Sequence, residues 1–206
     1  MKRCPFIILV IFLFHSQLPA SEMPDRERLE RLGNGEILLL EARTDEAGGS
    51  ARVQAIIHAP AKAAWDVIIS CEQTFTFVKG LKNCEVIEDA GNRALIHQVV
   101  KTSWLVPTQD FVFESLRDPY HEIKFQLVEG NLKAMQGKWQ FTESPDGLLV
   151  DYEIRIRPGI PVPAFIVSWV IRRGMPDLIA CIRGLAGGSG SMERVTEDLD
   201  RCQGTP

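Results

Sequence analysis

The chain has 206 residues, with 23 lysines and arginines against 27 aspartates and glutamates and a formal charge of −4. This acidic balance argues against a nucleic-acid partner, because phosphate binding depends on clustered basic side chains. The length suits one domain with a substantial core. The sequence has no G-x-S-x-G, H-E-x-x-H, P-loop or G-x-G-x-x-G motif, so we expect no metal and no cofactor, and an enzyme only as an alternative.

The N-terminus has the pattern of a secretory signal peptide. Lys2 and Arg3 precede a wholly apolar run at 6–14, and a small residue, Ala20, follows at the exit. The run is too short for a bilayer span, which needs about 20 apolar residues. We therefore expect export after cleavage of residues 1–20, with the periplasm favoured over free secretion. Without cleavage, the segment would instead tether the domain to a membrane.

The rest of the chain divides into a polar segment, 21–34, and one domain, 35–202. Residues 26–32 predict a short helix, and 37–44 and 52–58 predict two strands joined at Gly48-Gly49. Helices are expected at 61–69, which follows Pro60, and at 71–78. A period of two then predicts six strands, at 84–88, 93–102, 110–117, 121–128, 135–141 and 148–157.

The C-terminal part is predicted to be helical. Residues 164–185 form a long apolar stretch, in which Pro176 should kink the helix or split it in two. A glycine-rich stretch, 184–190, separates it from a charged helix at 192–201. The alternating strands need a cover for their apolar face, and the long helix is the candidate.

Aromatic side chains are the strongest functional signal of the predicted sheet. We expect them to point toward the long helix and, as a group, to line a ligand cavity; they are Phe111, Phe113, Phe125, Trp139, Phe141 and Tyr152. His97, in mid-strand, is a candidate acid/base or polar ligand contact. Asp151, Glu153, Arg155 and Arg157 predict a solvated face with cross-strand ion pairs, the alternative being an arginine that turns inward to bind an anion.

Two connections are unusually apolar. Trp104, Leu105 and Val106 lie between two predicted strands, and Phe165 follows the proline-rich connector at 158–163. Ordinary packing would explain both. Together they would also make an apolar rim or lid at the mouth of a cavity, and a candidate surface for transient membrane contact.

Four cysteines remain if the signal peptide is removed. An even number in an exported chain favours disulfides, and four cysteines allow three pairings. Cys71–Cys84 closes a short loop and is favoured. Cys181–Cys202 is its complement, which requires the helix between these two residues to break, because about 20 helical residues span about 30 Å.

Three stretches resemble the START and Bet v 1 (SRPBCC) helix-grip superfamily, and most closely its coenzyme Q-binding START and polyketide cyclase-like domains. They are 56–67 (IIHAPAKAAWDV), 77–88 (FVKGLKNCEVIE) and 137–141 (GKWQF), with Lys79 where the family usually has proline. The resemblance implies an α+β helix-grip fold, in which a curved antiparallel sheet wraps around a long C-terminal helix and leaves a cavity between them. Such packing motifs indicate fold more than function.

The leading hypothesis is therefore an exported binding or carrier protein for an apolar small molecule: a lipid, an isoprenoid quinone or a similar compound. One alternative is a small enzyme of the cyclase/aromatase type, with His97 or Tyr152 as acid/base. Another is a protein-interaction module that uses the apolar rim. The sequence gives no oligomeric state.

Overall fold

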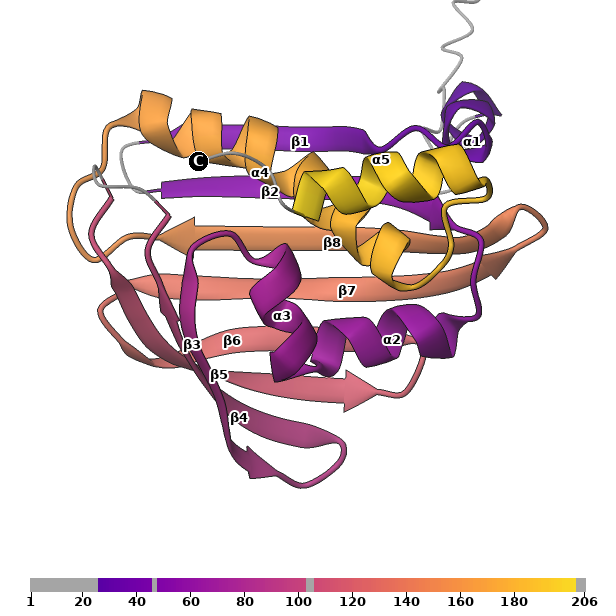
Figure 1. Ribbon diagram of the computed structural model, residues 1–206. Coiled ribbons are helices and arrows are strands. Elements are labelled where there is room, and N and C mark those ends of the chain that lie inside the picture. Colours follow the sequence, from indigo (N-terminus) through magenta and orange to yellow (C-terminus); the bar gives the residue numbers. More distant parts are fainter. Residues whose placement is uncertain (1–25, 46–47, 103–105, 203–206) are drawn as a thin grey trace, which may run out of the picture.

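The computed structural model describes residues 26–45, 48–102 and 106–202 (Figure 1). The elements follow in the order α1 (Arg26–Gly33), β1 (Leu38–Asp45), β2 (Gly48–Ile57), α2 (Ala61–Ile69), α3 (Cys71–Phe77), β3 (Leu81–Asp89), β4 (Arg93–Val100), β5 (Gln109–Asp118), β6 (Glu122–Gly130), β7 (Ala134–Ser144), β8 (Gly147–Arg157), α4 (Ala164–Leu185) and α5 (Met192–Cys202).

The strands form one antiparallel sheet in the order β1-β2-β8-β7-β6-β5-β4-β3, and helices α2 to α5 lie over one of its faces (Figure 1). Alternate residues of each strand point toward the helices, as a period of two requires. The main core lies between the two layers and includes Val53, Ala55, Ile57, Ala64, Trp65, Trp139, Val150, Tyr152, Ile179 and Ile182. The predicted α+β helix-grip fold is confirmed.

The opposite face of the sheet is only partly exposed to solvent. Leu32 of α1 is buried against Ile56, which points away from the main core. Farther along the strands, Arg52 contacts Asp151 at 2.6 Å, and Gln54 donates to the same carboxylate at 2.7 Å. Cross-strand ion pairs are therefore present on this face at Asp151 and Glu153, with Arg52 of β2 and Lys138 of β7 as the cations.

Helix α4 continues through Pro176 as a single element, so of the two effects expected of this proline, a kink or a split, the split does not occur. A proline removes one backbone hydrogen bond, here the one that would reach the carbonyl of Arg172. Buried side chains before and after this point, Ile171 and Ile179, keep both halves packed on the molecule. Tertiary packing thus outweighs the local preference for a break.

The chain reverses after α4 and returns as α5. Gly187 and Gly190 have φ values of 71° and 81°, which favour glycine. Gly188 passes so close to β2 that its carbonyl accepts the His58 N–H at 2.8 Å, and a side chain there would collide with Ile57. This turn brings α5 alongside α4.

A buried ion pair fastens α5 to α4. The guanidinium of Arg183 donates to both oxygens of Asp198, at 2.7 and 2.8 Å, and the two side chains are 5% and 2% exposed. Ser189 donates to the same carboxylate at 2.7 Å, and Arg183 also reaches the carbonyl of Gly35 at 2.9 Å. One network therefore joins the start of the domain, both helices and the turn between them.

The described part of the chain contains two disulfides, Cys71–Cys84 and Cys181–Cys202. The first joins α3 to β3. The second joins α4 to α5, and the glycine-rich turn supplies the helix break that this pairing needs. Cys71–Cys84 is the pair that the sequence favours, and Cys181–Cys202 is its complement.

Replacing Cys181 and Cys202 together by serine should lower the free energy of unfolding by about 2–4 kcal/mol, because the cross-link restricts the unfolded chain. Urea denaturation of the variant and the parent protein would measure this. Equal midpoints and slopes would show that the cross-link contributes nothing.

None of the helices in the described residues combines the length and hydropathy needed to cross a bilayer.

Candidate functional site

An apolar cavity of about 370 Å³ lies between the helix-covered face of the sheet and helices α2, α3 and α4. Its size falls in the range of small-molecule sites, which are mostly apolar with a few placed polar groups. β4, β5, β6, β7 and β8 supply the floor, and α4 supplies a row of aliphatic side chains as the roof: Ile166, Val167, Val170, Ile171, Met175 and Leu178.

Aromatic rings form one continuous wall of this cavity. The ring centroids of Phe111 and Phe113 are 6.2 Å apart, and those of Phe113 and Phe125 are 6.3 Å apart. Phe125 lies 6.2 Å from Tyr152, which stacks on Trp139 at 3.9 Å. All five line the cavity. The structure thus brings together five of the six aromatic residues that the alternation singles out.

The glycine of the G-x-W-x-F stretch makes room for this wall. Gly137 pairs with Phe125 across β6 and β7. A Cβ at Gly137 would collide with the Phe125 ring and with the carbonyl of Glu153. A side chain at this position would therefore displace the ring from the cavity.

Two sequence-predicted residues lie outside the cavity. Phe141 is buried, but it packs on Trp65 of α2, with ring centroids 5.9 Å apart, beyond the end of the hollow. His97 points to the other face of β4, because its neighbours Ile96 and Gln98 take the inward positions. The prediction that these two line the cavity is wrong.

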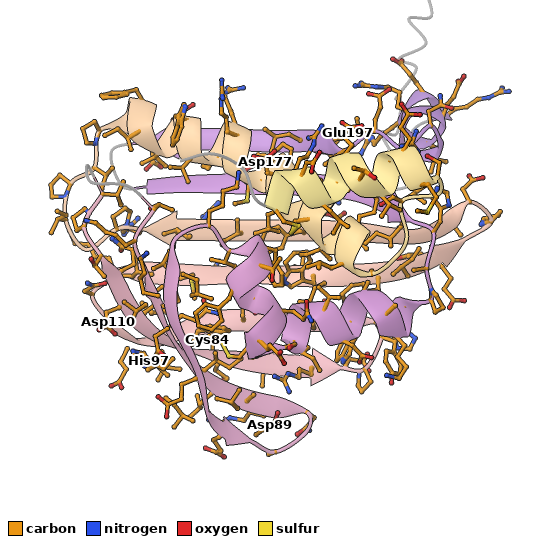
Figure 2. All side chains as sticks on the ribbon, in the orientation of Figure 1. Cys84, Asp89, His97, Asp110, Asp177 and Glu197 are labelled. Carbon is orange, nitrogen blue, oxygen red and sulfur yellow. A yellow bond between two sulfur atoms is a disulfide. The ribbon has the colours of Figure 1, made fainter. Side chains whose placement is uncertain are left out.

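His97 has polar partners of its own on that face. Its Nε2 lies 2.8 Å from the Asp110 carboxylate and its Nδ1 lies 3.4 Å from the Asn83 amide. Figure 2 shows His97 and Asp110 together at the edge of the molecule away from the helices. This position removes His97 as an acid/base for a cavity-bound molecule.

Tyr152 does line the cavity, but burial raises its pKa well above the ordinary value of a phenol. The phenol therefore stays neutral at physiological pH. No histidine, aspartate or glutamate of the described chain lines the cavity with it. Acid/base chemistry by Tyr152 would therefore lack a carboxylate or imidazole partner in the cavity.

One arginine turns into the cavity, and it is Arg117 of β5. Its side chain is 5% exposed, and Nη1 donates to Asp89 at 3.0 Å. Its Nε is buried without a hydrogen-bond partner. A buried N–H donor without an acceptor costs about 1–3 kcal/mol, so this atom is suited to an oxygen of a bound molecule.

Asp89 holds the other side of this guanidinium. The Gly91 N–H, and after it the Arg117 guanidinium, lower the pKa of the Asp89 carboxyl. Asp89 belongs to the β3–β4 hairpin, and its side chain is 45% exposed (Figure 2). The ion pair therefore has one end in water and the other in the cavity wall.

Further polar groups lie near both ends of the cavity. Ser115 is buried next to Arg117 on the same face of β5. At the other end of the strand, Gln109 donates to the carbonyl of Pro107 at 2.7 Å, and its Oε1 is buried without a partner. The apolar hollow thus has one polar group at each end of β5 that is not satisfied by the protein.

The predicted rim is only partly described. Trp104 and Leu105 lie outside the described residues. Val106 lines the cavity together with Val162 of the connector that precedes α4. Phe165 is 72% exposed and points outward, so it does not line the cavity, whereas the next residue, Ile166, does.

A disulfide and an ion pair hold together the side of the cavity near α3. The Cys71–Cys84 disulfide is part of the wall itself. Lys79 also borders the cavity and pairs with Asp177 of α4 at 2.8 Å. This ion pair joins the α3–β3 connection to α4.

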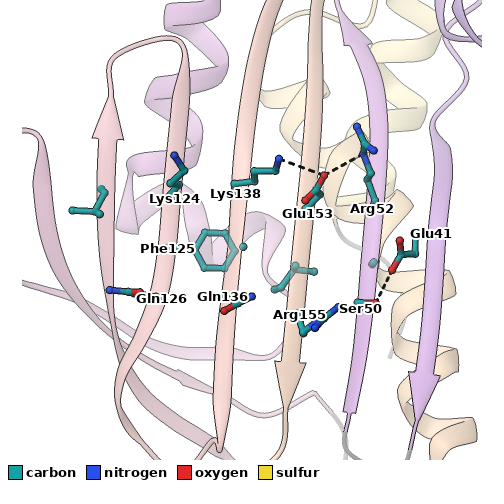
Figure 3. A pocket seen from close by; sticks show the side chains of 14 residues that line it. Glu41, Ser50, Arg52, Lys124, Phe125, Gln126, Gln136, Lys138, Glu153 and Arg155 are labelled. Carbon is teal, nitrogen blue, oxygen red and sulfur yellow. Dashed lines mark hydrogen bonds and ion pairs between the residues drawn. The ribbon is translucent and has the colours of Figure 1, made fainter. Parts of the chain in front are cut away.

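A second hollow, of about 640 Å³, lies on the outer face of the sheet (Figure 3). Several of its charged groups already pair with one another or with a neighbouring hydroxyl: Glu153 lies 3.3 Å from Arg52 and 3.6 Å from Lys138, and Ser50 donates to Glu41 at 2.9 Å. It is larger but polar, and it leaves no buried donor without a partner. The apolar cavity is therefore the candidate ligand site.

In the described residues, no cluster of three or more His, Cys, Asp or Glu side chains is placed to hold a metal ion.

Solved structures resemble this fold at low sequence identity. An aromatase/cyclase from a Streptomyces species matches with a TM-score of 0.54 and 16% identity, over 71% of this chain and 94% of the other. A STAR-related lipid transfer protein from Xanthomonas axonopodis matches with a TM-score of 0.54 and 13% identity, over 77% and 91%. A protein from Thermus thermophilus matches with 0.53 and 17%, over 75% and 97%. These likenesses show the fold. No curated protein matches significantly in sequence.

A sequence family gives the assignment. The family described as polyketide cyclase/dehydrase and lipid transport matches residues 57–183, which include α2 to β8 and most of α4. This span contains every aromatic residue of the cavity wall and Arg117. The chain belongs to the polyketide cyclase/dehydrase and lipid transport family.

Proposed function

We propose that the protein is an exported carrier for an amphiphilic small molecule, such as a lipid, an isoprenoid quinone or a similar compound. The observation that carries this proposal is an apolar cavity with one buried, unpartnered N–H donor, Arg117 Nε. An apolar body would lie among the aromatic rings and under α4. A polar end of the same molecule would accept a hydrogen bond from Arg117.

Burial of apolar surface would drive uptake. Each buried CH₂ group contributes about 0.8 kcal/mol, so a chain of several methylenes gains enough to leave water. The donor at Arg117 adds orientation, because a molecule inserted the other way round would leave that N–H without a partner. The acceptor is an oxygen, which a carboxylate, a phosphate or a quinone carbonyl can each supply.

Export is proposed from the N-terminal pattern. Lys2, Arg3 and the apolar run at 6–14 support a cleaved signal peptide. Two disulfides are compatible with an oxidising compartment. A carrier for poorly soluble molecules suits an aqueous space beside a membrane, so the periplasm is favoured.

The proposal is tested by recovering the protein from the exported fraction and examining it by native mass spectrometry and lipid extraction. We expect a bound apolar molecule, and uptake of a fluorescent fatty acid once this molecule is removed. Protein that carries nothing and takes up neither a fatty acid nor a quinone would contradict the proposal.

Ser115→Phe provides a matched test, since Ser115 is 3% exposed and lines the cavity. The larger side chain should reduce fatty-acid affinity by about tenfold or more, with a stability cost of about 1–3 kcal/mol from overpacking. Val128→Phe adds a ring at a residue that is 54% exposed and should leave affinity unchanged. Equal losses in both variants would show that the cavity is not the binding site.

A further inference from the structure

The first half of α4 has two apolar faces. Its inner face, with Val167 and Val170, lines the cavity. Its outer face exposes Phe165, at 72%, and Trp169, at 54%, which lie one turn apart. Large apolar side chains that lie together on a surface mark an interaction site.

Two basic side chains lie on the same outer face of α4, after the aromatic ones. Arg172 and Arg173 are exposed and follow Trp169 by about one turn. Arg172 Nε donates to Ser168 at 3.3 Å, and within the described ranges neither arginine forms an ion pair with a carboxylate. The chain as a whole has a formal charge of −4, so this pair of arginines is opposite in sign to the overall charge. Aromatic and basic side chains on one face of a helix are the pattern of an interfacial helix on anionic lipid.

The two halves of α4 are held very differently. The second half is fixed to its neighbours by the Cys181–Cys202 disulfide, the Arg183–Asp198 pair and the Lys79–Asp177 pair. The first half rests on β1 and β2 through apolar contacts, such as that of Ile171 with Gly49.

The junction between the halves is the weakest part of the helix backbone. Gly174 has no side chain and open space around it, and Pro176 lacks the N–H that would bond to the carbonyl of Arg172. Movement of the first half about this junction would uncover the cavity without breaking any of the cross-links on the second half.

We propose that the first half of α4, residues 164–173, docks on an anionic lipid bilayer and serves as the gate of the cavity. Phe165 and Trp169 enter the headgroup region, while Arg172 and Arg173 contact lipid phosphates. Docking favours the outward position of this half-helix, because its aromatic face then gains an apolar environment. The cavity opens toward the membrane from which its ligand is taken. This inference rests on the carrier function proposed above.

Vesicle co-sedimentation tests the docking surface, with protein recovered from the exported fraction and its N-terminus checked by mass spectrometry. Vesicles are made of phosphatidylcholine alone or with phosphatidylglycerol. The parent protein should prefer the anionic vesicles. F165S/W169S should weaken binding at least about tenfold. R172E/R173E should weaken binding to the anionic vesicles about thirtyfold or more and abolish the preference for them.

Control variants make comparable changes on other parts of the surface. Val128→Ser removes an apolar side chain that is 54% exposed, and K62E/K82E reverses two exposed charges on α2 and β3. Both should bind vesicles like the parent protein. Fatty-acid uptake from solution is measured for every variant, and it should be unchanged in F165S/W169S.

The outcomes separate this inference from the carrier function. Unchanged vesicle binding in both α4 variants, with normal uptake, overturns the docking surface and leaves the carrier intact. Loss of dimers or larger species in F165S/W169S, without an effect on vesicles, shows a contact between copies and also overturns it. Vesicle binding that depends on α4, in a protein that takes up no ligand, supports docking and refutes the carrier. Slower transfer of ligand from vesicles in the α4 variants supports the gate, and unchanged transfer overturns it.

Discussion

Replacing Asp198 with alanine is expected to lower the free energy of unfolding by about 3–5 kcal/mol, the largest effect on stability that we expect of a single substitution. The change leaves the Arg183 guanidinium buried, at 5% side-chain exposure, without the carboxylate that receives two of its hydrogen bonds. It also removes the acceptor of the Ser189 hydroxyl. Thermal and urea unfolding measure the effect, and the melting temperature should fall by roughly 10 °C.

The charge and the packing of this site can be separated. Asp198→Asn keeps the volume of the side chain but not its charge. It should still cause most of the loss in unfolding free energy that Asp198→Ala causes. A double change to apolar residues of similar size, Arg183→Met with Asp198→Leu, should recover much of it, because no buried charge remains. Asp66→Ala is the control: Asp66 pairs with Lys62 on the surface, with its side chain 52% exposed, and should cost less than about 1 kcal/mol. Equal costs at positions 66 and 198 would contradict the argument.

The buried pair also shows what the sequence does not reveal. Arg183 lies near the end of a long apolar helix and Asp198 lies in a charged one, so each resembles an ordinary surface residue in its own segment. Their contact depends on the angle at which α5 returns along α4, which the glycine-rich turn permits but does not specify. The disulfide between the same helices was among the pairings that the sequence allowed, because an even number of cysteines in a chain expected to be exported favours disulfides.

The cavity wall was largely predictable, for a simple reason. A strand with one buried face puts alternate residues on it, so Phe111 and Phe113 share one face of β5, and Phe125 lies on the apolar face of β6. Phe141 obeys the same rule and faces the helices, yet it lies beyond the end of the cavity. Where a cavity ends depends on how α2 packs, and periodicity carries no information on this.

His97 and Arg117 mark the limits of the pattern in opposite ways. The β4 sequence places apolar Leu95 and Val99 on the same face as His97, so alternation does not identify the inward side. For Arg117 a signal existed: it lies an even number of residues from Phe111 and Phe113, on the inward face. An inward arginine was expected only on β8, at Arg155 or Arg157, but both of these side chains are exposed and neither lines the cavity.

Arg117→Met is expected to weaken binding of a long-chain carboxylate by about tenfold to a hundredfold, because a hydrogen bond to a charged group contributes about 1.5–3 kcal/mol. The matching long-chain alcohol should bind the variant nearly as well as the parent protein, because it loses at most a neutral hydrogen bond. A quinone should fall between the two. Fluorescence displacement titrations with the three ligands measure this order, which also identifies the class of acceptor.

The fold should tolerate this change, which keeps the test sharp. Asp89, the partner left behind, is 45% exposed and can be solvated, and it keeps the hydrogen bond from the Gly91 N–H. Without the guanidinium, the pKa of Asp89 should rise toward its ordinary value while staying below it, which an NMR titration can follow. Arg155→Met makes the same substitution on the outer face and should change neither affinity nor the pKa of Asp89. If Arg117→Met bound all three ligands as the parent protein does, the buried Nε would have no part in ligand binding, and the position of Arg117 in the cavity wall would be structural alone.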